Sequence, residues 1–180
     1  MSTATAVPTG NYNVDPAHSG VGFAVKHMGI ATVRGAFRQF AGAIDSTETG
    51  LNITGTVEVA SVDTGESNRD GHLQGPDFFD AAQFPQISFA ATNVEPSADG
   101  KLSLTGEITI KGVTKPLELS GDYSQPDEDP WGNQRVGFEL AGVLNRRDFG
   151  LEFNQVLGSG NLLVSDLVKL TVEVSAVKAG

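Results

Sequence analysis

Apolar residues alternate with polar ones along most of this chain, and that pattern restricts the fold more than any other feature of the sequence. Alternation of period two places every second side chain on one face of an extended strand, so that face can be buried. Eight such runs are present, at 21–25, 33–44, 51–59, 87–91, 102–110, 117–123, 136–144 and 168–176. The run 33–44 changes phase after Phe37, as a bulge or bend would produce, and residues 11–15 suit a short extra strand.

The segments between these runs carry residues that form tight turns. They are rich in glycine, proline, aspartate and asparagine, at 48–50, 97–100, 112–116 and 125–133. No strand–helix–strand alternation appears, so we expect an antiparallel sheet, and eight such strands close into a barrel or split into a sandwich. The sequence therefore predicts a single all-β domain over 11–178, preceded by a flexible segment at 1–10.

Two segments interrupt the strand pattern. Residues 65–85 form a long connection that contains Phe78, Phe79 and Phe84, and such aromatic content argues against disorder. We expect one or two short helical turns there, with Ser67 as N-cap, lying across a mouth of the barrel. The second segment covers 146–160, and one helical turn is expected within it at 154–157.

Glycine occupies several inward positions of the strands, namely Gly55, Gly106, Gly121 and Gly142. Two interpretations remain open. The missing side chains allow the strands to bend and coil closely, as a barrel requires. Alternatively they leave room for a ligand, which an eight-stranded barrel is just wide enough to hold.

The charge and composition exclude several classes of function. The chain has 22 acidic and 12 basic residues, a formal net charge of −10, which favours solubility and repels nucleic-acid phosphates and anionic lipid headgroups. We therefore expect no nucleic-acid partner. The sequence contains no cysteine, which excludes disulfides and thiolate metal sites. It shows no secretory signal and no apolar run that could span a bilayer, so we expect a cytoplasmic protein.

A series of short motifs occurs in a specific order. The motifs are DPAHS at 15–19, FAVKHMG at 23–29, SVDT at 61–64, RDGHL at 69–73, DFFD at 77–80, GEITIKGVTKP at 106–116 and RDFG at 147–150. Together they resemble the YceI-like polyisoprenoid-binding family over roughly residues 12 to 177.

The resemblance has several implications. It implies a lipocalin-like, eight-stranded antiparallel barrel whose elongated apolar cavity holds a polyprenyl chain or another long-chain amphiphile, with no metal and no catalytic cofactor. It also allows a homodimer. Many members of the family are periplasmic or secreted proteins, whereas this sequence shows no leader.

The three histidines suggest an alternative function. His18, His27 and His72 lie near several aspartates in the sequence, and a His–Asp cluster can bind zinc or act in general acid–base catalysis on an apolar substrate. Their spacing matches no metal-binding motif, and no nucleophile elbow is present. We therefore expect neither a metal nor a catalytic residue. The histidines are interpreted as structural hydrogen-bonding groups or as contacts to the polar head of a ligand.

The phenylalanines are the main basis of the functional prediction. They fall on inward strand phases and in the two irregular segments, so they either fill a solid core or line a lipid slot and its lid. Burying about twenty lipid carbons would yield on the order of 10 kcal/mol or more. We predict that the apolar chain of the lipid lies among nine residues: Val21, Phe23, Val25, Phe37, Val57, Phe89, Ile108, Leu119 and Phe138. Three more, Phe78, Phe79 and Phe149, are predicted to close the mouth of the barrel. We expect His18, His27 or Arg69 to lie nearest the polar head of the lipid.

Three hypotheses therefore remain: a barrel that binds or carries a lipid, an enzyme that uses His and Asp, and a filled barrel that acts only as an interaction module. The first is the one we favour. An elongated void inside the barrel would distinguish the first hypothesis from the third.

Overall fold

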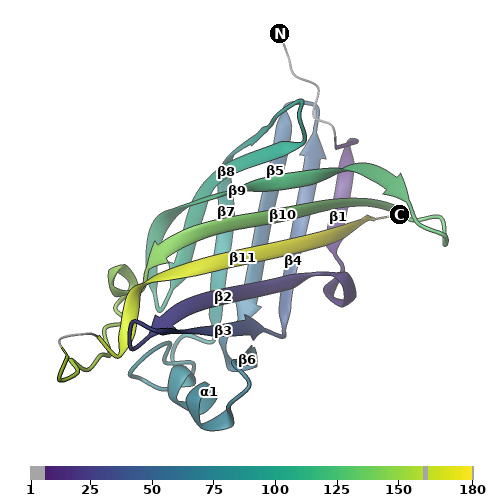
Figure 1. The fold of residues 1–180 in the computed structure, drawn as a ribbon. Coiled ribbons are helices and arrows are strands. Elements are labelled where there is room, and N and C mark those ends of the chain that lie inside the picture. The colour runs from purple at the N-terminus through teal and green to yellow at the C-terminus, as the bar shows by residue number, and fades with distance from the viewer. Residues whose placement is uncertain (1–6, 160–161, 180) are drawn as a thin grey trace.

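The computed structural model describes residues 7–159 and 162–179, and this part of the chain forms one antiparallel sheet with short helices around it (Figure 1). The described residues contain eleven strands: β1 (Gly10–Val14), β2 (Gly20–His27), β3 (Ala31–Phe37), β4 (Phe40–Thr47), β5 (Gly50–Glu58), β6 (Val62–Asp63), β7 (Gln86–Pro96), β8 (Lys101–Ile110), β9 (Val113–Glu128), β10 (Gln134–Asn145) and β11 (Val164–Lys178).

Eight of these described strands close a ring. They follow one another in the order β1, β4, β5, β7, β8, β9, β10 and β11, and β11 pairs again with β1. The predicted eight-stranded antiparallel barrel is therefore confirmed, and the extra strand expected at 11–15 is β1.

Strands β2 and β3 extend the sheet beyond that ring. β11 pairs with β2 through its first residues, up to Glu173, and with β1 through Ala176 to Lys178. In the same way β3 pairs with β2 and β4 pairs with β1. The phase change after Phe37 therefore marks the bend at which the chain passes from one of these partners to the other.

The helices lie where the strand pattern fails. α1 (Ser67–Gln74) occupies the 65–85 connection, and the 3-10 helix η3 (Arg146–Phe149) begins the 146–160 segment, so short helical turns in both connections are confirmed. Two further 3-10 helices are η1 (Pro16–His18) and η2 (Val59–Ser61).

Two details of the helix prediction are wrong. The N-cap of α1 is Glu66, whose carboxylate accepts the backbone N–H groups of Asn68 and Arg69, and Ser67 is the first helical residue. A longer acidic side chain serves here because it reaches two free N–H groups at once. The turn expected at 154–157 is absent among the described residues of that segment, because Val156 forms a β-bridge with Leu162.

One end of the barrel, the upper end in Figure 1, is solid. We call it the closed end and define it by six buried residues, Val7, Tyr12, Ser46, Leu102, Val136 and Ala176. Tyr12 has no exposed surface, and its hydroxyl donates to the carbonyl oxygen of Pro8 at 2.9 Å. The Ser46 hydroxyl donates to the carbonyl oxygen of Val7 at 2.9 Å. Residues 1–6 of the segment predicted to be flexible lie outside the described residues.

An ionic latch joins β1 and the β9–β10 hairpin beside the closed end. Arg135 on β10 donates from Nη1 to Asp15 at 2.9 Å and from Nε to Asp129 at 2.8 Å. Asp15 also lies 2.8 Å from Nδ1 of His18. These groups tie the segment after β1 to a hairpin about 120 residues further along the chain.

Candidate functional site: an apolar cavity behind an aromatic lid

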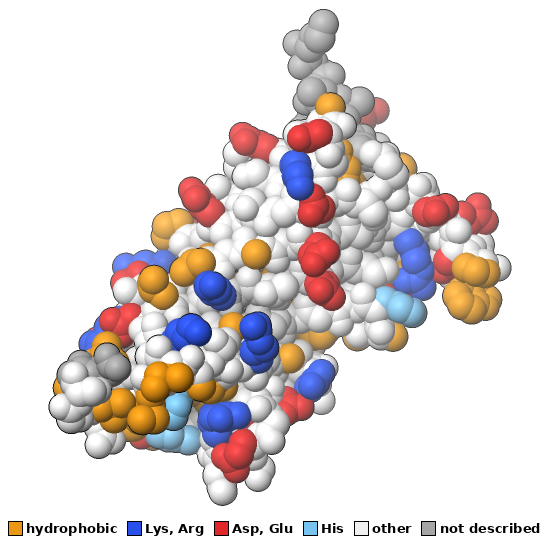
Figure 2. Space-filling model, viewed as in Figure 1, with side chains coloured by type: hydrophobic (Ala, Val, Ile, Leu, Met, Phe, Trp, Pro, Cys, Tyr) orange, Lys and Arg blue, Asp and Glu red, His pale blue; other side chains and the backbone are white. Residues whose placement is uncertain are grey.

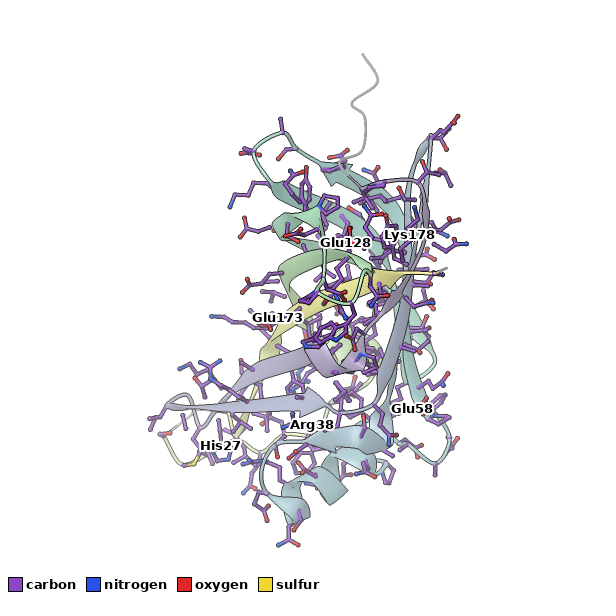
Figure 3. All side chains as sticks on the ribbon, turned by 90° about the vertical axis from the view of Figure 1, so that its right-hand side faces the viewer. His27, Arg38, Glu58, Glu128, Glu173 and Lys178 are labelled. Carbon is purple, nitrogen blue, oxygen red and sulfur yellow. The ribbon has the colours of Figure 1, made fainter. Side chains whose placement is uncertain are left out.

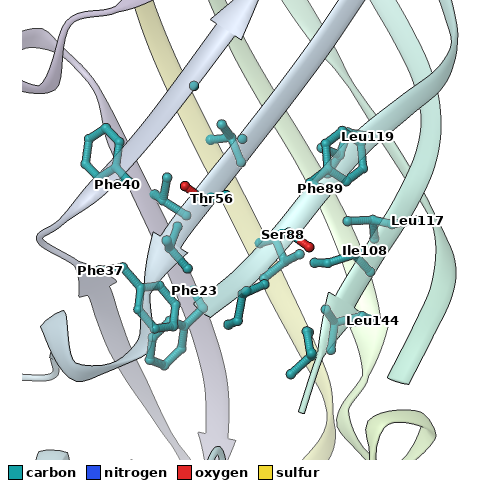
Figure 4. Close-up of a pocket in the computed structure, with 18 of the residues that line it drawn as sticks. Phe23, Phe37, Phe40, Thr56, Ser88, Phe89, Ile108, Leu117, Leu119 and Leu144 are labelled. Atoms are coloured by element: carbon teal, nitrogen blue, oxygen red, sulfur yellow. The ribbon is translucent and has the colours of Figure 1, made fainter. Parts of the chain in front are cut away.

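The other end of the barrel is hollow. Its cavity has a volume of about 240 Å³, larger than the roughly 150 Å³ apolar cavity that accepts benzene in an engineered protein. Side chains from the surrounding strands, among them Phe23, Phe89 and Leu119, point into it (Figure 4). Among the described residues that line the cavity, only Arg146 and Glu173 are charged, and most of the others are aliphatic or aromatic.

Twelve of the fifteen residues predicted to contact a lipid lie in the cavity wall, and their contact with a lipid stays a prediction. The strand phases place nine of them there, and the two irregular segments supply three. They are Val21, Phe23, Val25, Phe37, Val57, Phe89, Ile108, Leu119, Phe138, Phe78, Phe79 and Phe149.

The three polar residues predicted for the headgroup end are not in the wall. His18 is exposed in η1 and pairs with Asp15. Arg69 donates from Nε to the Thr64 hydroxyl at 2.7 Å and from Nη2 to the Thr64 carbonyl at 2.8 Å. These bonds fix α1 to the residues that precede it. His27 continues the inward phase of β2 but is the last residue of that strand, out at the β2–β3 turn (Figure 3).

Three phenylalanine rings connect the barrel wall to its lid. The ring centroids of Phe23 and Phe37 lie 5.6 Å apart, and those of Phe37 and Phe79 lie 5.9 Å apart in an edge-on arrangement. Such tilted pairs are favourable for aromatic rings. The Phe23 ring has room because its neighbour on β3 is Gly35, where any Cβ would overlap the ring. The sequence therefore places a glycine where an aromatic side chain comes close to the next strand.

The lid is the segment from α1 to the turn that follows it. It contributes Leu73, Phe78 and Phe79 to the cavity wall. The backbone N–H of Phe79 donates to the carbonyl oxygen of Leu73 at 3.0 Å, which folds the turn back against the helix. This segment carries the aromatic residues that the sequence predicted for a barrel mouth.

A histidine holds the outer side of the lid. His72 Nε2 lies 2.8 Å from the carboxylate of Asp77, and its ring packs edge-on against Phe78 and Phe153 at centroid distances of 5.0 and 4.8 Å. Phe153 belongs to the segment after η3, so His72 joins the two irregular segments. This contact agrees with the structural interpretation of the histidine.

The inward glycines have two different roles. A Cβ at Gly121 would overlap the carbonyl oxygen of Glu139, and one at Gly106 would overlap the Phe89 ring, so both glycines allow close packing. Gly142 is similar, with Leu119 Cδ2 at 2.7 Å. Gly55 lines the cavity, and a Cβ there would meet nothing closer than 3.6 Å. Of the four, only Gly55 leaves space inside the barrel.

The prediction missed Arg146. It is 4% exposed and lies in the cavity wall, because η3 folds the chain back just after β10. Its guanidinium donates to the carbonyl oxygens of Leu151, Val164 and Ser165. Burial lowers the pKa of this guanidinium, while Asp166 at 3.8 Å raises it. Arg146 continues the inward phase of β10 by two residues beyond Leu144, and that periodicity was the available indication in the sequence.

The ionisable side chains do not converge elsewhere on a metal site. Within residues 7–159 and 162–179, no group of three or more His, Asp or Glu side chains is close enough to hold a metal ion. In the same part of the chain, no helix is both long and apolar enough to cross a membrane.

Comparison with known proteins gives consistent matches over most of the chain. Residues 12–176 match the YceI-like domain family. Protein YceI of Escherichia coli O157:H7 is 34% identical over 157 residues, which is 84% of this chain and 82% of that protein. The crystal structure of the YCEI protein of Campylobacter jejuni is similar with a TM-score of 0.74 at 30% identity, covering 86% of this chain and 90% of that one.

A more distant structure has the same fold. It is a polyisoprenoid-binding domain of Saccharophagus degradans, implicated in plant cell wall breakdown. Its TM-score is 0.68 at 14% identity, and the match covers 93% of this chain and 98% of that domain.

Proposed function

The chain belongs to the YceI-like domain family, and from that premise we propose that it binds a long apolar chain, a polyprenyl lipid or a similar amphiphile, inside the barrel. The observation that carries the proposal is the hollow end, where a continuous wall of aliphatic and aromatic side chains surrounds a cavity of about 240 Å³. Its relative in Saccharophagus degradans is described as polyisoprenoid-binding, and this supports the same class of ligand here.

The energetics favour an apolar ligand over a polar one. Each methylene group that leaves water for such a wall contributes about 0.8 kcal/mol, so a chain needs no polar anchor to be retained against the cost of association. A polar ligand would lose its hydrogen bonds to water and find few partners, because the guanidinium of Arg146 already donates to three carbonyl groups.

Binding without catalysis is the role we assign to the barrel. His72 is engaged with Asp77 on the outer side of the lid, and His18 is engaged with Asp15 at the ionic latch. Neither histidine lines the cavity, so neither faces the position of a ligand. We assign these His–Asp pairs a structural role, and we propose that the protein carries or sequesters its lipid. The cytoplasmic compartment stays a prediction.

The proposal is tested by extracting the purified protein and identifying any co-purified lipid by mass spectrometry, followed by titration with a fluorescent polyprenyl probe. We expect a long-chain lipid in the extract and saturable uptake of the probe by protein from which lipid has been removed. If the extract contains no lipid and the stripped protein takes up no probe, the proposal is wrong.

A matched pair of variants localises the binding. The substitution Gly55→Leu fills part of the cavity, and we expect it to weaken probe binding by about tenfold or more, since several buried methylene contacts are lost. Ala141→Leu adds the same side chain on the exposed outer face of β10 and should leave binding unchanged. Equal effects of both substitutions would place the probe outside the cavity.

A further inference from the structure

Three basic side chains share the outer face of β11, β2 and β3. Lys169 on β11 lies opposite Ala24 on β2, and Ala24 lies opposite Arg34 on β3. Residues directly opposite each other point to the same face of a sheet. Lys26 is two residues after Ala24 and shares that face. The neighbours Val25 and Val168 line the cavity, so the face that carries the three cations is the outer one.

Among the residues that the structure describes, these cations have no acidic partner. All three are exposed, and none forms a salt bridge within the described part of the chain. The nearest acidic residue before Lys169 on β11 is Asp166, which Arg147 binds at 2.8 Å. Two interstrand spacings, about 10 Å, separate the backbones of Lys169 and Arg34. A protein with a net charge of −10 therefore keeps three unpaired positive charges together on one face.

Exposed apolar side chains surround the same three cations. Val143 on β10 lies opposite Lys169, and Leu167 is two residues before Lys169 on the outer face of β11. Met28 and Ile30 form the β2–β3 turn, just beyond Lys26. Ile30 is 79% exposed and Leu167 is 58% exposed. We call this surface the basal patch and define it by Lys26, Arg34 and Lys169 with Met28, Ile30, Val143 and Leu167.

The basal patch is separate from the acidic part of the molecule. Figure 2 shows several blue side chains beside orange ones over the lower part of this face, where a few red ones also occur, and a row of red ones over its upper part. Charges separated by more than about 8–10 Å are screened at physiological salt. The local field over the patch is therefore set by its own cations, although the net charge of the chain predicts repulsion of anionic headgroups.

The patch also lies against the hollow end of the barrel. Val25 and Val168 point into the cavity from the same strands whose outer residues form the patch. Beside them, within the described residues, β3 pairs with β6 only at Ala36 and Phe37, so the edge of β3 from Ala31 to Gly35 is unpaired in the sheet. An open edge of the sheet therefore lies next to the patch.

We propose that the basal patch docks on the surface of a bilayer that contains anionic lipids, with Ile30 and its apolar neighbours inserted among the headgroups. The combination of clustered cations with exposed aliphatic side chains matches the two contributions to interfacial binding, electrostatic attraction and buried apolar area. This inference rests on the proposed lipid binding. Docking would bring the hollow end of the barrel to the membrane, from which a lipid chain would be taken or to which it would be released.

The test is co-sedimentation of the full chain with vesicles of phosphatidylcholine alone and with added phosphatidylglycerol. We expect binding to the second kind only, and weaker binding at high salt. One basic residue near an anionic surface contributes about fivefold to partitioning, so the triple variant Lys26→Gln, Arg34→Gln and Lys169→Gln should bind about a hundredfold more weakly. The substitution Ile30→Ser should lower binding by several-fold through the lost apolar contact.

The chain offers a matched control on a single strand. Lys178 is exposed at the other end of β11, far from the β2–β3 turn (Figure 3). Lys169→Gln should weaken vesicle binding about fivefold, and Lys178→Gln should leave it unchanged. Equal effects would show that net charge alone controls binding and would overturn the assignment of the patch.

The remaining outcomes separate this inference from the proposed function. Probe uptake without vesicle binding would overturn the docking and leave the lipid-binding barrel intact. Vesicle binding without probe uptake would keep the docking surface and overturn the barrel function. If the patch instead pairs two copies of the chain, analytical ultracentrifugation would show a dimer that the triple variant loses, with no vesicle binding, and the bilayer would be the wrong occupant.

Discussion

The closed end and the cavity end are built from the same long strands, and they differ in what completes the wall. At the closed end the ring is closed by backbone pairing, since β1 pairs with both β4 and β11. At the cavity end β11 pairs with β2 instead of β1, and β2 pairs with β3. Among the described residues, β3 then pairs with β6 over two residues only. Side chains of the lid, Leu73, Phe78 and Phe79, complete the wall there.

This difference explains why one end is solid and the other hollow. Closure by hydrogen-bonded strands fixes the spacing of the wall, and Tyr12 and its neighbours are buried there. Where a lid closes the wall, the spacing between the wall and the lid is set by side-chain packing. The β2–β3 hairpin there extends the sheet beyond the closed ring. A barrel in which strand pairing is interrupted on one side can therefore be solid at one end and hollow at the other.

The largest expected effect lies in the core of the closed end. Tyr12→Ala removes a fully buried ring together with its hydrogen bond to Pro8, and should lower the free energy of unfolding by about 4 kcal/mol. Phe40→Ala removes a cavity-lining ring that packs on fewer atoms, and should cost about half as much. Urea denaturation of both variants measures the difference. Equal losses would mean that the two ends are packed alike.

A smaller contrast is expected between two inward glycines. Gly121→Ala places a methyl group against the carbonyl oxygen of Glu139, so the strands must shift, at a cost of about 3 kcal/mol. Gly55→Ala points a methyl group into the cavity and should change stability by less than about 1 kcal/mol. Thermal unfolding followed by circular dichroism compares them. A large loss in the Gly55 variant would contradict an open interior at that position.

The smallest expected effect concerns the ionic latch beside the closed end. Hydrogen bonds from His18 and Arg135 lower the pKa of Asp15 to about 2, and those from Arg135 and the backbone of Asn133 lower the pKa of Asp129 to about 2. Groups with a depressed folded-state pKa stabilise the fold above their unfolded pKa of about 3.9, and this contribution is lost as the pH falls toward 2. Stability should therefore decrease between about pH 4 and pH 2.

The substitution Asp129→Asn tests the latch. It should reduce the loss of stability across that acid window, because one of the two responsible carboxylates is gone. Asp148→Asn changes an exposed aspartate that forms no salt bridge in the described part of the chain, and should leave the pH profile unchanged. The measurement is the unfolding midpoint of the unmodified protein and of both variants between about pH 4 and pH 2. If all three lose stability in parallel, the latch is not the cause of the loss.

Much of the cavity wall was predictable because strands have a strict period of two. Phe23, Phe89 and Phe138 are in the wall because their neighbours two residues away are also inward. The rule fails at strand ends. His27 and Arg146 each continue an inward phase, yet His27 lies at an open turn and Arg146 is buried, because β10, unlike β2, is followed by a helix that folds back over the barrel.

The sequence by itself determined the antiparallel strands, the inward residues and the positions of the two irregular segments, because these follow from local periodicity and turn chemistry. The choice of a barrel over a sandwich came from the resemblance to a known family. The tertiary structure alone decided which inward glycine leaves space, which end is hollow and where the charges gather. Gly55 and Gly121 look alike in the sequence, and Lys26, Arg34 and Lys169 come from distant parts of a chain with a net charge of −10. Packing and charge distribution depend on which strands become neighbours, and strand pairing across more than a hundred residues is not encoded in any local pattern.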